Sequence, residues 1–137
     1  MIPNKFLCSV ALCALLLPAQ NTPRFPQANL VSVKAAPDHL LGKPFMPGGT
    51  LATYKKGKTE WTLFVAKCTN AVDAAIRLPD WRKALKDAKF EPSFGGYFGL
   101  DDGVPVFVFA KDAWVAGVKG LPEKEADAQA RLLAAKL

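Results

Sequence analysis

Residues 105–119 read Pro-Val-Phe-Val-Phe-Ala-Lys-Asp-Ala-Trp-Val-Ala-Gly-Val-Lys, and this stretch decides the fold. Val106 to Phe109 is apolar at every position, so a strand formed there has no side suited to water. Ala113 to Ala116 has the same character, and Lys111-Asp112 between the two runs is typical of a turn. The pattern predicts two adjacent strands near the middle of a sheet, with both faces of that sheet covered.

Other elements are expected on both sides of this pair. The alternation of apolar and polar residues, the turn residues and the helix caps indicate a hairpin at 50–55 and 59–67, helices at 71–78 and 80–88, a strand bent by Pro92, Gly95 and Gly96 at 90–100, and a closing helix at 122–137. The order ββαβββα predicts one α+β domain over 49–137, with a largely antiparallel sheet and helices packed on one face.

The second face of this sheet needs its own cover. We expect the segment before the domain to supply it, and a dimer partner or an apolar ligand are the alternatives. That segment, 20–48, is rich in Pro and Gly and has no sustained period, which predicts an irregular linker draped over the domain. Within it, 31–33 is a candidate short strand and 39–41 a candidate turn of helix.

Residues 1–19 have the pattern of a secretory signal peptide. Lys5 gives a positive start, residues 6–17 are an apolar run, and Pro18-Ala19 precedes a cleavage site. A run of this length is shorter than the roughly 20 residues that span a bilayer. We therefore expect an exported bacterial protein, periplasmic or secreted. The alternative is an inner-membrane protein anchored by an uncleaved N-terminus.

The cysteines agree with a non-lipidated export product. Cys8 and Cys13 follow Leu7 and Leu12, whereas a lipidated cysteine follows a small residue, so a lipid anchor is not expected. Both lie in the signal, which leaves Cys68 as the one thiol of the mature chain. A single thiol forms no internal disulfide, so the hydrophobic core must stabilise the fold by itself.

The composition is that of a folded, basic domain. Of 137 residues, 50% are hydrophobic and 22% are charged, and the formal net charge is +6. This charge favours anionic partners such as lipid headgroups or acidic polymers. Because an exported protein rarely meets nucleic acid, none is expected as a partner.

Evidence for catalysis in the sequence is weak. Cys68 follows a strand and precedes a helix start, where a thiol can be activated, so it is the one candidate nucleophile. A packed, inert thiol is the simpler interpretation, because the only histidine, His39, lies in the irregular segment. No ligand spacing suggests a metal, and no motif suggests a cofactor. Glu91 and Asp112 have no evident partner, so a paired-carboxylate hydrolase is not supported.

The best local candidate for binding is the predicted hairpin, whose turn is flanked by basic and aromatic residues. A contact with an anionic surface would use Tyr54, Lys55, Lys56, Lys58 and Trp61. The structural alternative is that the lysines only keep the hairpin soluble and block edge pairing.

Together these features favour a non-enzymatic binding or interaction module of the cell envelope. Its partner could be another envelope protein, an anionic envelope polymer or a second copy of the chain. The alternatives are a small hydrolase or thiol-dependent enzyme that uses Cys68, and a homodimeric structural subunit. Clustered aromatic and aliphatic residues, rather than convergent polar groups, favour binding over catalysis.

Overall fold

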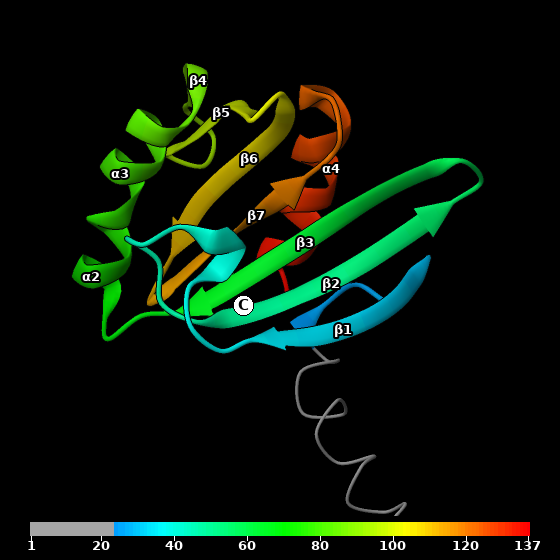
Figure 1. Cartoon of the computed structure of the whole chain (residues 1–137), viewed down its shortest axis with the longest axis horizontal. Helices are drawn as coiled ribbons and strands as arrows, with labels where there is room; N and C mark the ends of the chain where they lie inside the picture. Colours follow the sequence, from blue (N-terminus) through cyan, green and yellow to red (C-terminus); the bar gives the residue numbers. More distant parts are fainter. Residues whose placement is uncertain (1–23) are drawn as a thin grey trace, which may run out of the picture.

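The computed structural model describes residues 24–137, so the expected signal peptide at 1–19 lies outside the described residues. Seven antiparallel strands form one sheet in the order β1-β2-β3-β7-β6-β5-β4 (Figure 1). The strands are β1 (Leu30–Ala36), β2 (Gly49–Lys56), β3 (Thr59–Lys67), β4 (Lys86–Glu91), β5 (Gly96–Asp101), β6 (Val104–Lys111) and β7 (Trp114–Lys119). The helices are α2 (Ala71–Ala75), α3 (Arg77–Ala84) and α4 (Glu123–Ala134), with a short 3-10 turn at Leu40–Gly42.

The α+β class and the antiparallel sheet agree with the sequence prediction. Strands β6 and β7 lie at the centre of the sheet, as the doubly apolar stretch predicts. Phe107 and Phe109 belong to the core on one face, and Val106 and Val108 belong to the core on the other. All four side chains are fully buried or nearly so, because neither face of this strand tolerates water.

The helices are divided between these two cores. Ala74 of α2 and Trp81 of α3 pack with Val106 and Val108, so these two helices share one face, as expected. The expectation is corrected for α4, because its Ala130 and Leu133 pack on the opposite face. Two short helices cannot cover a seven-stranded sheet on both sides, and α4 has an apolar stripe suited to the second face. No helix within residues 24–137 is long and apolar enough to cross a membrane.

The segment before β2 contributes to both cores. Phe25 is fully buried on the α4 face, and Leu40 and Met46 are buried on the α2–α3 face. Residues 30–36, expected to be irregular apart from a short strand at 31–33, form the full edge strand β1, which pairs with β2. This corrects the linker description of 20–48 over that stretch. None of the side chains of this edge strand is fully buried, so its sequence lacks the alternating apolar pattern that identifies a strand.

Several element boundaries from α2 onward also differ from the prediction: α2 ends at Ala75 instead of at residue 78, and α3 begins at Arg77 instead of at residue 80. The helix expected at 80–88 ends at Ala84, since Leu85 is extended, and β4 begins at Lys86. The bent strand expected at 90–100 is the β4–β5 hairpin, which turns at Gly95 with a φ of 68°. At Gly96 an added side chain would overlap the carbonyl oxygen of Val108, so β5 and β6 approach closely at a position without a Cβ atom.

Candidate functional site

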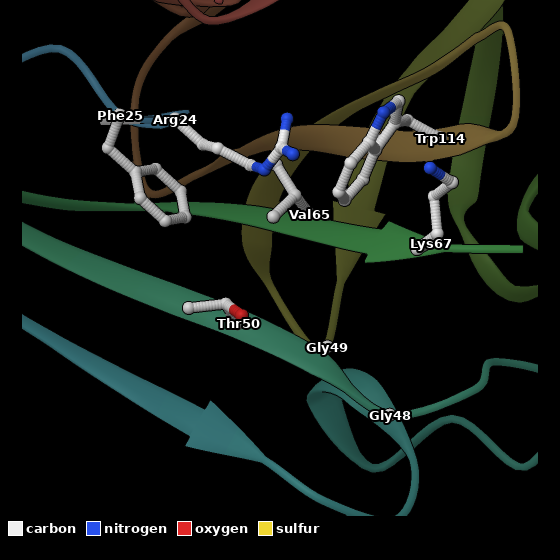
Figure 2. A pocket seen from close by; sticks show the side chains of 8 residues that line it. All are labelled: Arg24, Phe25, Gly48, Gly49, Thr50, Val65, Lys67 and Trp114. Carbon is white, nitrogen blue, oxygen red and sulfur yellow. The ribbon is translucent and has the colours of Figure 1, made fainter. Parts of the chain in front are cut away.

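A pocket of about 210 Å³ lies on the α4 face of the sheet, where β3 ends and β7 begins. Figure 2 shows the eight residues that line it: Arg24, Phe25, Gly48, Gly49, Thr50, Val65, Lys67 and Trp114. They come from three parts of the chain: the segment before β1, the start of β2, and the facing ends of β3 and β7. The volume is below the roughly 300–1,000 Å³ typical of sites for drug-sized ligands, so the pocket suits a small group.

Strand pairing sets the first half of the site. Lys67 and Trp114 are direct partners in the β3–β7 ladder, and side chains of such a pair stand next to each other on one face. The Lys67 ammonium accordingly lies 4.8 Å from the centre of the Trp114 ring. An ammonium at this distance is attracted to the electron-rich face of the indole, and the Lys67 side chain is otherwise exposed to solvent.

The second cation reaches the same ring from the N-terminal segment. The Arg24 guanidinium carbon lies 4.7 Å from the centre of the Trp114 ring. Phe25, the next residue, is fully buried in the core and holds this part of the backbone against the sheet. In Figure 2 the indole lies between the two cationic side chains.

The pocket has an uncompensated positive charge. None of the described residues that line it is acidic. Among residues 24–137, neither Arg24 nor Lys67 forms an ion pair with a carboxylate. Two positive charges on one indole attract an anion and repel each other, so an anionic ligand would relieve that repulsion.

Two glycines shape the floor of the pocket. A side chain on Gly48 would overlap the carbonyl oxygen of Pro37, and one on Gly49 would overlap that of Val65. The backbone therefore passes close to both neighbouring segments only because these positions lack a Cβ atom.

No protein-family model matches the chain, and comparisons with curated proteins and with solved structures find no similar protein. The functional argument therefore depends on the geometry of the chain's own residues.

Cys68, the one candidate nucleophile, is buried with an exposed fraction of 6%. Its side chain belongs to the α2–α3 core, on the face opposite the pocket. Burial raises the pKa of the thiol, and the hydrogen bond from Arg77 only partly offsets this effect. A thiol with a raised pKa is a poor nucleophile at neutral pH, because the thiolate is the reactive form.

His39, the single histidine of the sequence, does not activate this thiol. The Nδ1 atom of His39 lies 2.7 Å from the carbonyl oxygen of Met46, in a hydrogen bond internal to the loop before β2. Within residues 24–137, no group of three or more His, Cys, Asp or Glu side chains could hold a metal ion. The described chain thus offers neither a cysteine–histidine pair nor a metal centre.

The predicted hairpin contact is divided between core and solvent. Tyr54 and Trp61 are stacked with ring centres 5.5 Å apart, and both rings are buried on the α4 face. The Tyr54 hydroxyl donates a 2.7 Å hydrogen bond to the carbonyl oxygen of Pro26. Lys55, Lys56 and Lys58 are exposed around the turn. The aromatic rings therefore belong to the core, and only the lysines remain available to a surface partner.

A second hollow, of about 220 Å³, lies between this hairpin and the first turns of α4. Lys56 and Trp61 line it together with Glu125, so a carboxylate accompanies the cation there. The hollow consequently lacks the one-sided charge that distinguishes the pocket around Trp114.

Glu91 has a partner that sequence reasoning did not find. Its carboxyl group is within hydrogen-bonding reach of the Glu123 carboxyl at the start of α4. Desolvation, followed by the contact with Glu123, raises the pKa of Glu91 to about 7. The hydrogen bonds from Glu91 and Lys89 lower the pKa of Glu123. Neither carboxyl group lines the pocket around Trp114 or the hollow beside the hairpin.

The pocket around Trp114 was also missed by sequence reasoning. Lys67 and Trp114 are far apart in the chain, and only the pairing of β3 with β7 makes them neighbours. Arg24 lies in a segment without a detectable period. A basic residue at the end of one predicted strand and a tryptophan at the start of another was the available signal, but many strand orders would have separated them.

Proposed function

We propose that this protein is an exported, non-enzymatic binding module of the bacterial cell envelope, and that it binds a small anionic group in the pocket around Trp114. The observation that carries the proposal is the pair Arg24 and Lys67, held on one indole with no carboxylate lining the pocket. The proposed export rests on the signal-peptide pattern of residues 1–19.

Carboxylates and phosphates are the groups that such a site suits. A guanidinium donates two parallel hydrogen bonds to either group, and an ammonium adds a compact point charge. Because Arg24 and Lys67 are already held by the ring, less side-chain freedom is lost when the anion arrives. The exposed hairpin lysines would add a looser contact with an anionic polymer, away from the pocket.

The alternatives receive less support from the geometry. A thiol-dependent enzyme needs an accessible thiolate, whereas Cys68 is buried and its pKa is raised. A homodimer was expected as one way to cover the second face of the sheet. In this chain α4 and Phe25 cover that face, which removes the reason for a dimer there.

Calorimetric titration with citrate and with pyrophosphate tests the proposal. The sheet and both of its cores are built from residues 24–137, so the titration uses residues 20–137, without the apolar run of the signal. We expect one of the two anions to bind, and Arg24→Gln or Lys67→Gln to weaken binding about tenfold, the effect of losing roughly 1.4 kcal/mol.

Two variants serve as matched controls. Lys124→Gln removes the same charge from an exposed position on α4, and Cys68→Ala changes a side chain on the opposite face. Both should bind as the parent does. Equal weakening by Lys124→Gln would reduce the effect to net charge, and the absence of binding by either anion would contradict the proposal.

A further inference from the structure

The outer side of α2 and α3 is apolar where a surface helix is usually polar. Val72 and Ile76 lie one helical turn apart, and 70% and 60% of their surfaces are exposed. The opposite side of the same helices carries Ala74 and Trp81, which are buried in the core. A helix that packs on a sheet needs one apolar stripe, so the second stripe has no role in the fold.

The backbone makes these residues one continuous strip. Ile76, which separates α2 from α3, has helical φ and ψ angles of −71° and −10°. Helical spacing therefore places Val72, Ile76, Pro79 and Lys83 on one side, and Pro79 and Lys83 are exposed. Figure 1 shows α2 and α3 following each other along the side of the molecule opposite the β2–β3 turn.

The charge on this strip is basic at one end. Arg82 and Lys83 are exposed in the last turn of α3. Asp73 pairs with Arg77 at 2.9 Å, so that carboxylate is neutralised within the helix. Asp80 lies at the border of the strip and is only partly exposed. We name the set Val72, Ala75, Ile76, Pro79, Arg82 and Lys83 the outer strip.

The outer strip is too small for a stable protein interface. Such an interface buries about 800 Å² on each partner, whereas the strip offers only two large apolar side chains, Val72 and Ile76, along α2 and α3. A lipid surface needs no matched area, since apolar side chains enter between the headgroups and neighbouring cations meet the phosphates. The formal net charge of the full sequence is +6, and only Lys5 of its charged residues lies in the expected signal, so the mature chain remains basic and is attracted to an anionic bilayer.

We propose that the outer strip docks the protein on an anionic lipid surface, with Val72 and Ile76 inserted among the headgroups and Arg82 and Lys83 on lipid phosphates. The contact is shallow, reversible and sensitive to salt, because two aliphatic side chains supply its apolar part. It does not depend on the pocket around Trp114, which lies on the other face of the sheet.

Cosedimentation of residues 20–137 with vesicles tests this proposal. Vesicles of equimolar phosphatidylglycerol and phosphatidylcholine should bind the protein, and vesicles of phosphatidylcholine alone should bind it much less. The double variant Val72→Ser/Ile76→Ser should lose about tenfold or more in partitioning, since each side chain contributes apolar burial. Arg82→Gln/Lys83→Gln should weaken binding to the anionic vesicles and reduce its salt dependence.

Matched variants separate the outer strip from other surfaces. Leu132 is an exposed apolar residue on α4, with an exposed fraction of 53%, and Leu132→Ser should bind as the parent does. Arg24→Gln/Lys67→Gln should also bind vesicles normally, whatever its effect on citrate or pyrophosphate. Three outcomes would overturn the proposal: no binding to anionic vesicles, unchanged binding by the Val72/Ile76 variant, or loss only in the Arg24/Lys67 variant, which would place the lipid headgroup in the pocket.

Discussion

Glu91 carries a carboxyl group whose protonation is expected to affect the stability of the fold. It lies at the end of the edge strand β4, and its neighbour Glu123 lies at the start of α4. Lys89 forms a 2.9 Å ion pair with Glu123 and not with Glu91. The cation therefore keeps Glu123 ionised, and the two carboxyl groups can then avoid repulsion only if Glu91 holds a proton.

This arrangement predicts that Glu91 destabilises the protein at alkaline pH. Its pKa is raised to about 7 in the folded protein. A raised carboxyl pKa contributes stability that is complete below the unfolded pKa and is lost as pH rises through the folded value. Since part of the side chain remains in water, we expect the free energy of unfolding to fall by about 1–2 kcal/mol between pH 5 and pH 8.

Denaturant unfolding at several pH values measures this effect. Glu91→Gln should remove that part of the pH dependence and be more stable than the parent at pH 8. Glu60→Gln is the matched control, because Glu60 is an exposed residue whose ion pair with Lys55 spans 3.8 Å. If the free energies of unfolding of the parent and of Glu91→Gln have parallel pH profiles, protonation of Glu91 does not contribute to stability.

At the scale of elements, Gly117 decides how closely β6, β7 and β3 approach. An added Cβ atom at this position would overlap the carbonyl oxygen of Phe107 and lie 2.5 Å from the ring of Phe64. Phe64 is itself fully buried and stacks on Trp81 of α3. The small residue in β7 therefore makes room for the aromatic contact that holds α3 against the sheet.

We expect Gly117→Ala to destabilise the protein by about 2–3 kcal/mol, because the neighbouring backbone cannot move away without breaking ladder hydrogen bonds. Thermal or denaturant unfolding measures the loss. Ser93→Ala, at an exposed turn position, should have an effect within about 0.5 kcal/mol. A Gly117→Ala variant as stable as the parent would mean that β7 is not packed as closely as described.

The elements that could be predicted from the sequence are those with a buried side. The hairpin at 50–67 and the closing helix follow an apolar period, the central strands at 104–119 contain continuous apolar runs, and all are present. The two edge strands were missed or shortened. Lys86–Glu91 reads Lys-Asp-Ala-Lys-Phe-Glu, and most of its side chains face water. Solvent-exposed edges carry charges that prevent edge-to-edge pairing, and this removes the signal that identifies a strand.

The candidate site was less predictable than the fold for a related reason. No lining residue stands out within its own segment of the sequence. Whether it contributes to a site depends on which strands are neighbours in the sheet. Lys67 and Trp114 meet because β3 pairs with β7 rather than with β4. Exposed residues such as Val72 and Ile76 follow a helical period as a core stripe does, so the sequence cannot show that they face outward.

For the whole molecule, the N-terminal segment is part of both cores. Phe25, Leu40 and Met46 are each almost completely buried, and β1 pairs along the length of β2. Removing residues 20–46 should therefore lower the free energy of unfolding by several kcal/mol, at about 2 kcal/mol for each large side chain. It should also increase binding of a hydrophobic dye. Equal stability and equal dye binding of the trimmed and intact proteins would contradict this packing.

The export proposal makes a prediction about the complete chain. A cleaved signal of 19 residues should shorten an epitope-tagged precursor by about 2 kDa, and the processed form should lie outside the cytoplasm. Arg24, whose guanidinium contacts the Trp114 ring, would then be close in sequence to the new N-terminus. Fractionation, immunoblotting and mass spectrometry measure processing, location and the absence of lipid. Full-length protein retained in the cytosol would contradict export, and a full-length form in the inner membrane would support the uncleaved anchor.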